Sequence, residues 1–409
     1  TEIYTLSLRD ALPILARPPH PPAVGLAMDA TSTGTDASAP RPRRKARGLG
    51  YENQWALTWR KFTRHRLGVA GGVVVLLLYI VVLIPEFLAP VTLDDANTKY
   101  AYAPPQAISF GISDEHGWHF EPHVDAYKAK VDYNSGKRLF ADDPDTPIDV
   151  GLFVHGEAYK LFGLIDGDIH LIGPVEAGQP FYLVGADRLG RDILSRTIYG
   201  TRISMTIGLI GVALSLFFGI LMGGLSGYFG GTTDLIIQRL IEFIQSVPSI
   251  PLWIGLAAAI PQDVSPMEVY FLITVILSVI GWTGLARVVR GRFLAMRTED
   301  FVKAAQLDGA STFRILFRHM LPSFLSHIIA VVSLAIPSMI LAETALSYLG
   351  IGLRVPIVSW GVLLQEAQNV HTIAGAPWLL LPGLAVVIAV LALNFLGDGL
   401  RDAADPYSG

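Results

Sequence analysis

Six apolar stretches, each of about 20 residues, constrain the fold of this chain more than any other feature, because a helix of that length spans the hydrocarbon core of a bilayer. They lie near residues 67–88, 203–229, 235–260, 269–290, 323–342 and 378–397. The third is the least regular, since Arg239 and Glu242 lie within it and Pro248 and Pro251 interrupt it. The sequence therefore predicts an all-α polytopic membrane protein with six transmembrane helices.

The composition supports this prediction and excludes several other classes of protein. Of the 409 residues, 51% are hydrophobic and 16% are charged, whereas about 25% of residues in soluble domains are charged. The chain has no cysteine, so a disulfide framework, a Cys-ligated metal site and a thiol nucleophile are excluded.

The distribution of Lys and Arg predicts the orientation in the membrane. Nine basic residues precede the first stretch at 41–66, and seven lie between the fourth and fifth at 287–318. The opposite loops, 261–268 and 350–376, contain a single basic residue, Arg354. Because cytoplasmic loops are enriched in Lys and Arg, we expect both termini to be cytoplasmic.

These patterns divide the chain into five expected segments. Residues 1–66 form a disordered, basic cytoplasmic tail, and 67–90 form the first transmembrane helix. Residues 91–200 form an extracytoplasmic insert with 17 acidic and 9 basic residues. Residues 201–400 form the transmembrane core, with a cytoplasmic loop at 291–322, and 401–409 form a cytoplasmic C-terminal tail. The expected core of the insert is aromatic: Trp118, Phe120, Tyr127, Phe140, Phe153, Tyr159 and Phe162.

The first 27 residues differ from the rest of the tail. Thr1 is not a methionine, the first methionine is Met28, and residues 5–14 look like translated sequencing-adapter text. We interpret 1–27 as a non-native start, and peptide mapping that recovered these residues from the native protein would refute this.

The loop between the fourth and fifth stretches has the most distinctive pattern in the chain. It predicts two short helical segments that are separated at Gly309, with Ser311 as the N-cap of the second. Apolar faces on such a loop are expected to be buried, either against the protein's own helices or against a partner. The apolar residues are Phe301, Ala304 and Ala305 in the first segment and Ile315, Leu316 and Phe317 in the second.

This loop resembles the signature loop of ABC importer permeases, E-A-A-x3-G-x9-I-x-L-P. Ala304-Ala305, Gly309 and Leu321-Pro322 match it, whereas Lys303 replaces the Glu and His319 replaces the Ile. Four further segments are similar to the dipeptide/oligopeptide subfamily: 185–196 (GADRLGRDILSR), 343–350 (ETALSYLG), 359–361 (SWG) and 397–406 (GDGLRDAADP). The resemblance covers about residues 180–409 and the first stretch, but not the insert at 91–180.

The resemblance implies the type I importer permease fold and the transmembrane subunit of an ATP-driven, binding-protein-dependent importer in the inner membrane. The implied partners are a second homologous permease subunit, two ATP-binding subunits and an extracytoplasmic substrate-binding protein. The loop would dock on an ATP-binding subunit, with Gly309 providing the bend. The loop residues implied in this coupling are Lys303, Ala304, Ala305, Asp308, Gly309, Arg314, His319, Leu321 and Pro322.

The chain itself is expected to be non-catalytic. It has no G-x4-G-K-[ST] phosphate-binding loop, so ATP would bind to the partner subunits, and no cofactor is expected on this chain. Peptides are the favoured substrate, with oligosaccharides or nickel as alternatives within the family. A passive channel or a membrane scaffold is the alternative from another class, although a channel has no use for a docking loop. Nothing indicates binding to nucleic acid.

Small residues recur at every fourth position along and just beyond the second stretch. This spacing allows close approach of helices, either in internal packing, which we favour, or in a sliding or subunit-contact face. The residues are Gly211, Ser215, Gly219, Gly223, Gly227 and Gly231.

Ionisable residues at membrane depth often mark a transport pathway, and Glu242 and Glu343 are the candidates here. We favour a structural role for both. Glu242 can pair with Arg239 three residues earlier, and Glu343 lies near the end of a stretch, where pairing or solvation is easy.

Two polar clusters precede the second stretch. Arg188, Arg191 and Arg196 alternate with acidic residues, which suits either a salt-bridged loop or a contact with the binding protein. His116, His119 and His123 could suit zinc or nickel, but their spacing matches no standard site. We therefore expect no metal site.

Overall fold

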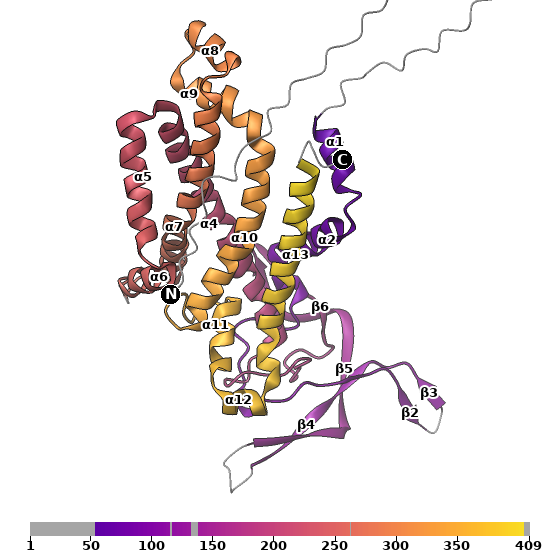
Figure 1. Cartoon of the computed structure of the whole chain (residues 1–409). Helices are drawn as coiled ribbons and strands as arrows, with labels where there is room; N and C mark the ends of the chain where they lie inside the picture. Colours follow the sequence, from indigo (N-terminus) through magenta and orange to yellow (C-terminus); the bar gives the residue numbers. More distant parts are fainter. Residues whose placement is uncertain (1–53, 115–116, 132–137, 262, 405–409) are drawn as a thin grey trace, which may run out of the picture. The chain divides into compact units, whose positions relative to one another are not determined.

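The computed structural model describes residues 54–114, 117–131, 138–261 and 263–404 (Figure 1). The chain divides into two units between residues 51 and 52, and every described residue belongs to the second. The predicted tail at 1–66 lies outside the described residues up to residue 53. Beyond that point the prediction of disorder is corrected: α1 occupies Gln54–Phe62 and α2 begins at Arg66. The local reason is that Phe62 is buried, which anchors the helix.

The first predicted span is α2 (Arg66–Leu83), which packs along α13 (Leu381–Ala404). The two helices approach closely where Gly71 faces the backbone of Ala392. His65 begins α2, since its Nδ1 accepts a hydrogen bond from the Gly68 amide at 2.8 Å. A short helix, α3 (Pro85–Leu88), follows and leads into the insert.

Two long helices, α4 (Ile193–Phe229) and α7 (Pro266–Met296), pack against each other along much of their length (Figure 1). Asp192 begins α4, and its Oδ2 accepts a hydrogen bond from the Ser195 amide at 2.7 Å. Ser265 begins α7 in a capping box with Glu268, in which each side chain accepts from the other residue's amide.

The third predicted span is a bent pair of helices. α5 (Gly231–Ser246) and α6 (Ser249–Ala258) meet at an angle of 85°. Val247 is extended, and Pro248 has no amide hydrogen with which to continue the helix. By length and composition, five helices in the described part of the chain can cross a membrane, or six if the bent pair counts as one span: α2, α4, α7, α10 and α13, with α5–α6 as the pair.

The fifth spanning helix, α10 (Leu325–Tyr348), packs on α4 and α13. Two tryptophans connect the segment that follows it to the start of α4 and to the loop before α4. The Trp360 indole donates to Thr197 O at 3.1 Å, and the Trp378 indole donates to Ala186 O at 2.9 Å. This segment contains α11 (Trp360–Leu364), η4 (Gln365–Gln368), α12 (Val370–Gly375) and η5 (Pro377–Leu380).

The insert contains β-strands, so the expectation of an all-α fold is corrected. After η1 (Thr98–Tyr100), an antiparallel sheet has the strand order β1-β4-β5-β6, and β2 pairs with β3 beside it (Figure 1). The strands pair mainly as hairpins between consecutive segments, and they contain no continuous apolar run of the kind that predicts a spanning helix. The strands are β1 (Ile108–Ser109), β2 (Ile112–Asp114), β3 (Gly117–His119), β4 (His123–Val131), β5 (Arg138–Leu161) and β6 (Ile165–Pro174).

The core of the insert differs from the aromatic core that we predicted. Its buried residues include Val124, Ile148 and Phe181. Of the predicted aromatic residues, Tyr127 and Phe140 pack together, with ring centroids 5.4 Å apart. Tyr159 packs edge-on against His170 and is partly exposed, and the side chain of Trp118 lies outside the described residues. The remaining three, Phe120, Phe153 and Phe162, are each more than half exposed.

The backbone explains two of the exposed rings. Phe153 and Phe162 have φ values of +57° and +52°. The first interrupts the regular alternation of faces along β5, and the second lies in the turn that follows β5. Aromatic content therefore did not identify the buried face of the sheet.

Candidate functional site: the loop between α7 and α10

Short helices form the loop between α7 and α10. The first is α8 (Asp300–Leu307), whose C-cap residue Asp308 is followed by Gly309. Gly309 has φ +73°, in the left-handed region that favours glycine. The Ala310 amide donates to Ala305 O at 3.0 Å and closes the end of the helix. The predicted break at Gly309 is therefore present.

The second part of the loop begins at Ser311. As predicted, its hydroxyl caps the next helix, accepting a hydrogen bond from the Arg314 amide at 3.4 Å. α9 (Thr312–Arg314), the π-helix η2 (Ile315–Met320) and the 3-10 helix η3 (Leu321–Phe324) then continue into α10.

One face of the loop is buried against the protein's own helices. Val302 and Met320 are fully buried, and Ala305 and Ile315 are nearly so. These residues form one cluster with Phe293 and neighbouring residues of α7 and α10. The protein's own helices therefore cover this face, which fixes the position of α8.

The opposite face of α8 is exposed and apolar. Phe301, Ala304 and Leu307, spaced three residues apart, form what we call the α8 surface. Leu307 is 89% exposed and Phe301 is 42% exposed. Phe313, in the following segment, is 67% exposed. Large apolar side chains grouped on a protein surface commonly mark an interaction site.

The residues that the signature implied divide between the two faces. Lys303, which stands where the signature has Glu, lies on the exposed side, and its Nζ is 4.0 Å from Asp300 Oδ1. Its charge is therefore in contact with solvent. Sequence reasoning missed Val302 and Leu307, although the spacing from Phe301 and Ala304 could have indicated Leu307. Lys303, Ala304, Asp308, Gly309, Arg314 and Pro322 are exposed, His319 and Leu321 are half-buried, and Ala305 is buried.

The small residues of α4 lie mostly in its contacts with neighbouring helices. Gly219, Gly223 and Gly227 face α7. A Cβ added to Gly223 would lie 2.4 Å from Ala286 O, and one added to Gly227 would lie 2.6 Å from Arg290 O. The two helices approach so closely that these positions exclude any side chain.

The other three small residues have different surroundings. Gly211 faces Met339 of α10, and the Ser215 hydroxyl donates to Ser278 O of α7 at 3.4 Å. Gly231 does not belong to the contact: it begins α5 with φ +54°, and an added Cβ would meet no atom within 4 Å.

Glu343 of α10 is fully buried. Its Oε1 accepts hydrogen bonds from the hydroxyls of Ser347 at 2.8 Å and Ser359 at 2.7 Å, and its Oε2 accepts one from Ser204 at 3.4 Å. Of the two expectations for Glu343, pairing or solvation, the structure shows hydrogen-bonded partners and no solvent access, because the chain after α10 folds back and places Ser359 against the carboxylate. Glu343 thereby joins α4, α10 and the start of α11.

Glu242 has a simpler environment. Its Oε2 lies 2.7 Å from Arg239 Nη1, and both side chains are exposed. The predicted local ion pair is present.

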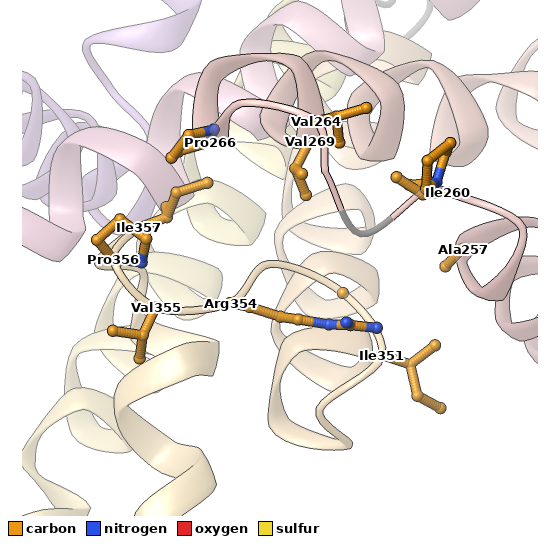
Figure 2. A pocket seen from close by; sticks show the side chains of 12 residues that line it. Ala257, Ile260, Val264, Pro266, Val269, Ile351, Arg354, Val355, Pro356 and Ile357 are labelled. Carbon is orange, nitrogen blue, oxygen red and sulfur yellow. The ribbon is translucent and has the colours of Figure 1, made fainter.

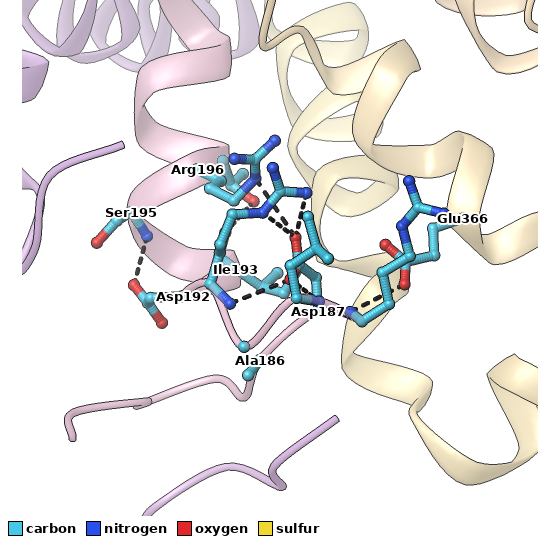
Figure 3. A network of polar contacts seen from close by, with 12 residues as sticks. Ala186, Asp187, Asp192, Ile193, Ser195, Arg196 and Glu366 are labelled. Carbon is cyan, nitrogen blue, oxygen red and sulfur yellow. Dashed lines mark hydrogen bonds and ion pairs between the residues drawn. The ribbon is translucent and has the colours of Figure 1, made fainter. Parts of the chain in front are cut away.

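Asp187 is the centre of the polar cluster before α4 (Figure 3). It is 1% exposed, and its Oδ1 accepts hydrogen bonds from the Leu189 and Arg191 amides. Its Oδ2 accepts from Arg191 Nε at 2.7 Å and lies 3.8 Å from Arg196 Nε. The Arg188 amide donates to Glu366 Oε1 at 3.0 Å, which links the loop to η4.

Two carboxylates near this cluster have raised pKa values. Burial raises the pKa of Asp192 from 3.8 to about 6, against the effect of its hydrogen bonds with Ser195. Burial also raises the pKa of Glu366, and the charge of Asp187 adds to that effect. Both carboxylates are therefore costly to ionise where they lie.

A second feature of this end of the helices is a pocket of about 340 Å³ between α6, the start of α7 and the segment after α10. Figure 2 shows Arg354 extended among its mostly apolar lining, which includes Ile260, Val269 and Ile357. Such a lining suits an apolar group.

The three histidines are only partly described. His116 and the side chain of His119 lie outside the described residues, and His123 Nδ1 lies 2.9 Å from Glu121 O. Across the residues whose positions are described, no group of three or more His, Asp or Glu side chains could hold a metal ion.

Two models of known protein families match stretches of this chain. The family model described as "Binding-protein-dependent transport system inner membrane component" matches residues 215–407. The model described as "N-terminal TM domain of oligopeptide transport permease C" matches residues 53–105.

Curated relatives extend the similarity. The chain is 36% identical over 242 residues to the oligopeptide transport system permease protein OppC of Haemophilus influenzae, covering 59% of this chain and 75% of that protein. It is 38% identical over 224 residues to the dipeptide transport system permease protein DppC of Bacillus subtilis, covering 54% and 68%. A solved structure of the MetNI methionine ABC transporter in an inward-facing conformation covers 52% of this chain and 98% of its own, at 16% identity and a TM-score of 0.42. That likeness is too low to support an inference.

Proposed function

This chain belongs to the family of binding-protein-dependent transport system inner membrane components, and we propose that it is the membrane-spanning subunit of an ATP-driven importer of peptides. The names of its relatives support peptides rather than the alternatives, oligosaccharides or nickel, since the matched proteins are oligopeptide and dipeptide permeases. On this proposal the chain lies in the inner membrane with both termini in the cytoplasm, and the insert faces outward.

The α8 surface is the observation that best supports this proposal. Because Val302 and Ala305 anchor one face of α8 to α7 and α10, the other face presents Phe301, Ala304 and Leu307 in a fixed orientation. An anchored helix with an exposed apolar face suits a partner that pushes or pulls on it, and a passive channel has no need of one. The partner proposed here is an ATP-binding subunit.

The rest of the machinery would come from other chains. We propose a second homologous permease subunit beside this one and a substrate-binding protein outside. We also propose two ATP-binding subunits, one of which docks on the α8 surface of this chain. ATP would bind and be hydrolysed on the partner subunits. This chain would supply half of the pathway and transmit the movement.

The substitution Leu307→Glu tests this assignment. A carboxylate on the α8 surface would have to be desolvated in the contact, so we expect co-purification of the ATP-binding subunits and peptide-stimulated ATPase activity to fall on the order of tenfold, the equivalent of about 1.4 kcal/mol of contact free energy. The measurements are pull-down from detergent and ATP hydrolysis, with and without a tripeptide, by proteoliposomes that contain the whole complex.

Leu164→Glu is the matched control, since Leu164 is 83% exposed and lies in the insert. It should leave both measurements unchanged. The proposal fails if Leu307→Glu behaves like this control, or if the purified chain alone conducts solutes as a stable homomer without ATP.

A further inference from the structure

A small pocket lies between the start of α4 and the η4 segment (Figure 3). Its volume is about 260 Å³. Its charged lining consists of Asp187, Arg188, Arg191, Arg196 and Glu366, and the rest of the lining is largely apolar. The pocket therefore has charged and apolar walls, and it lies at the end of the helices from which the insert extends (Figure 1).

Arg196 is the unusual member of this lining. It is only 4% exposed, and its Nε has no hydrogen-bond partner among the described atoms. Its ion pair with Asp187 is long, at 3.8 Å. Buried guanidinium groups normally find acceptors for their donors, so a buried Arg that lines a pocket with an unused donor indicates a missing acceptor.

The two carboxylates of the pocket do not fill that role. Asp187 already accepts two amide hydrogen bonds and one from Arg191 Nε. Glu366 accepts the Arg188 amide at 3.0 Å. With three arginines against two acids, the pocket retains one positive charge when both acids are ionised, and a single added negative charge would balance it.

The size and chemistry of the pocket limit the ligand further. Guanidinium groups bind planar anions such as carboxylates through paired hydrogen bonds. Pockets for whole ligands usually measure about 300–1,000 Å³, so this one suits an end group rather than an entire peptide. The C-terminal residue of a peptide has both the charge and the size required.

We propose that this pocket binds the C-terminal carboxylate of a peptide substrate, with Arg196 as the buried donor and Arg188 and Arg191 at its rim. The identity of the ligand rests on the proposed function, whereas the affinity for a carboxylate does not. The pocket would then hold one end of the peptide near the extracytoplasmic side before it enters the helical core.

Direct binding tests this proposal without transport. The complex of this chain with its partner permease and ATP-binding subunits, in nanodiscs and without the binding protein, is titrated with glycylglycine and with glycylglycine amide. Tryptophan fluorescence is a suitable readout, because the Trp360 and Trp378 indoles donate to Thr197 O and Ala186 O on either side of Arg196. We expect the free acid to bind at least tenfold more tightly than the amide.

Four variants sharpen the test. Arg196→Gln should weaken binding of the acid on the order of tenfold and abolish the preference over the amide, whereas Arg196→Lys should retain part of it. Arg239→Gln removes an arginine from the exposed pair with Glu242 and should change nothing. If Arg196→Gln does not assemble, Arg188→Gln, at an exposed position, should still lower the preference severalfold.

The outcomes separate this inference from the proposed function. Equal binding of acid and amide, no binding of the acid, or an unaltered preference in both the Arg196→Gln and Arg188→Gln complexes would overturn the carboxylate site. If Arg196→Gln left the titration unchanged and weakened only the capture of added binding protein by the nanodiscs, measured separately, the pocket would be a protein contact and the inference would be wrong. A wild-type complex that takes up no peptide with ATP would overturn the transport function, whatever the titration shows.

Discussion

Asp192 caps α4 with a carboxylate that burial makes costly to ionise. One of its oxygens, Oδ2, accepts the Ser195 amide at 2.7 Å, while Oδ1 is buried without a partner in the described structure. Burial raises its pKa to about 6, from an ordinary value of 3.8. Because the folded protein holds this proton more tightly than the unfolded chain does, Asp192 stabilises the fold most below about pH 4. That contribution is lost as the pH rises through 6.

Replacing Asp192 with Asn should remove this pH dependence. An Asn keeps a side-chain oxygen for the cap and has no charge to bury. The shift of about two pKa units corresponds to about 3 kcal/mol, so the variant should gain up to that much stability over the wild type between pH 4 and pH 7. Unfolding temperatures of the two proteins in detergent, measured across this range, check the prediction. Parallel curves would contradict it, since all other titrating groups are shared.

At the scale of elements, the contact between α4 and α7 depends on small side chains. The Cβ of any residue at position 223 would lie 2.4 Å from Ala286 O, which is backbone and cannot rotate away. The helices would have to separate. Gly284 of α7 offers a comparison within the same helix pair, because a Cβ there would meet no atom within 4 Å.

The substitution Gly223→Ala should therefore destabilise the protein by about 1–3 kcal/mol, the usual cost of overpacking. Gly284→Ala is the matched control and should be neutral or slightly stabilising, since Ala favours helix by up to about 1 kcal/mol over Gly. Thermal unfolding of both variants in the same detergent gives the comparison. An equal effect at the two positions would show that helix propensity, and not close approach, explains the glycines.

At the scale of the whole described unit, Arg202 joins the helices to the insert. Its guanidinium lies 2.5 and 2.8 Å from the two carboxylate oxygens of Glu86 in α3, and its Nε donates to Val82 O at the end of α2. The same group lies 5.3 Å from the centre of the Phe162 ring, in the turn between β5 and β6. One side chain of α4 thereby contacts three segments.

Arg202→Met should leave the buried Glu86 unpaired and cost about 3 kcal/mol, at the lower end for a broken buried pair because Arg202 is partly exposed. The turn between β5 and β6 should also loosen, so that trypsin cleaves faster after Lys160. Adding Glu86→Leu should restore most of the stability, although not the contact with Phe162. A double variant no more stable than Arg202→Met would show that the ion pair is not the cause.

The features that the sequence predicted well are those with a local signal. The five long helices follow from continuous apolar residues, and the start and end of the helices around Gly309 follow from Ser311 and from the glycine itself. The bend at Pro248 was indicated by the prolines, but its angle was not. The strands of the insert were missed although they pair mainly as hairpins between consecutive segments, because the chain there is rich in charged residues and shows no apolar run.

Tertiary structure decided which side chains are buried, which are exposed and which have hydrogen-bond partners. The sequence determined that the chain must place several helices in a membrane and carry a loop of two short helical segments with a break at Gly309, because these depend on residues close together in the chain. It did not determine that Glu343 is enclosed by hydroxyls, that Leu307 is left uncovered, or that Arg196 lines a pocket while its buried Nε has no partner. Those outcomes depend on which distant segments fold back on each residue, and burial and hydrogen bonding exist only once those segments meet.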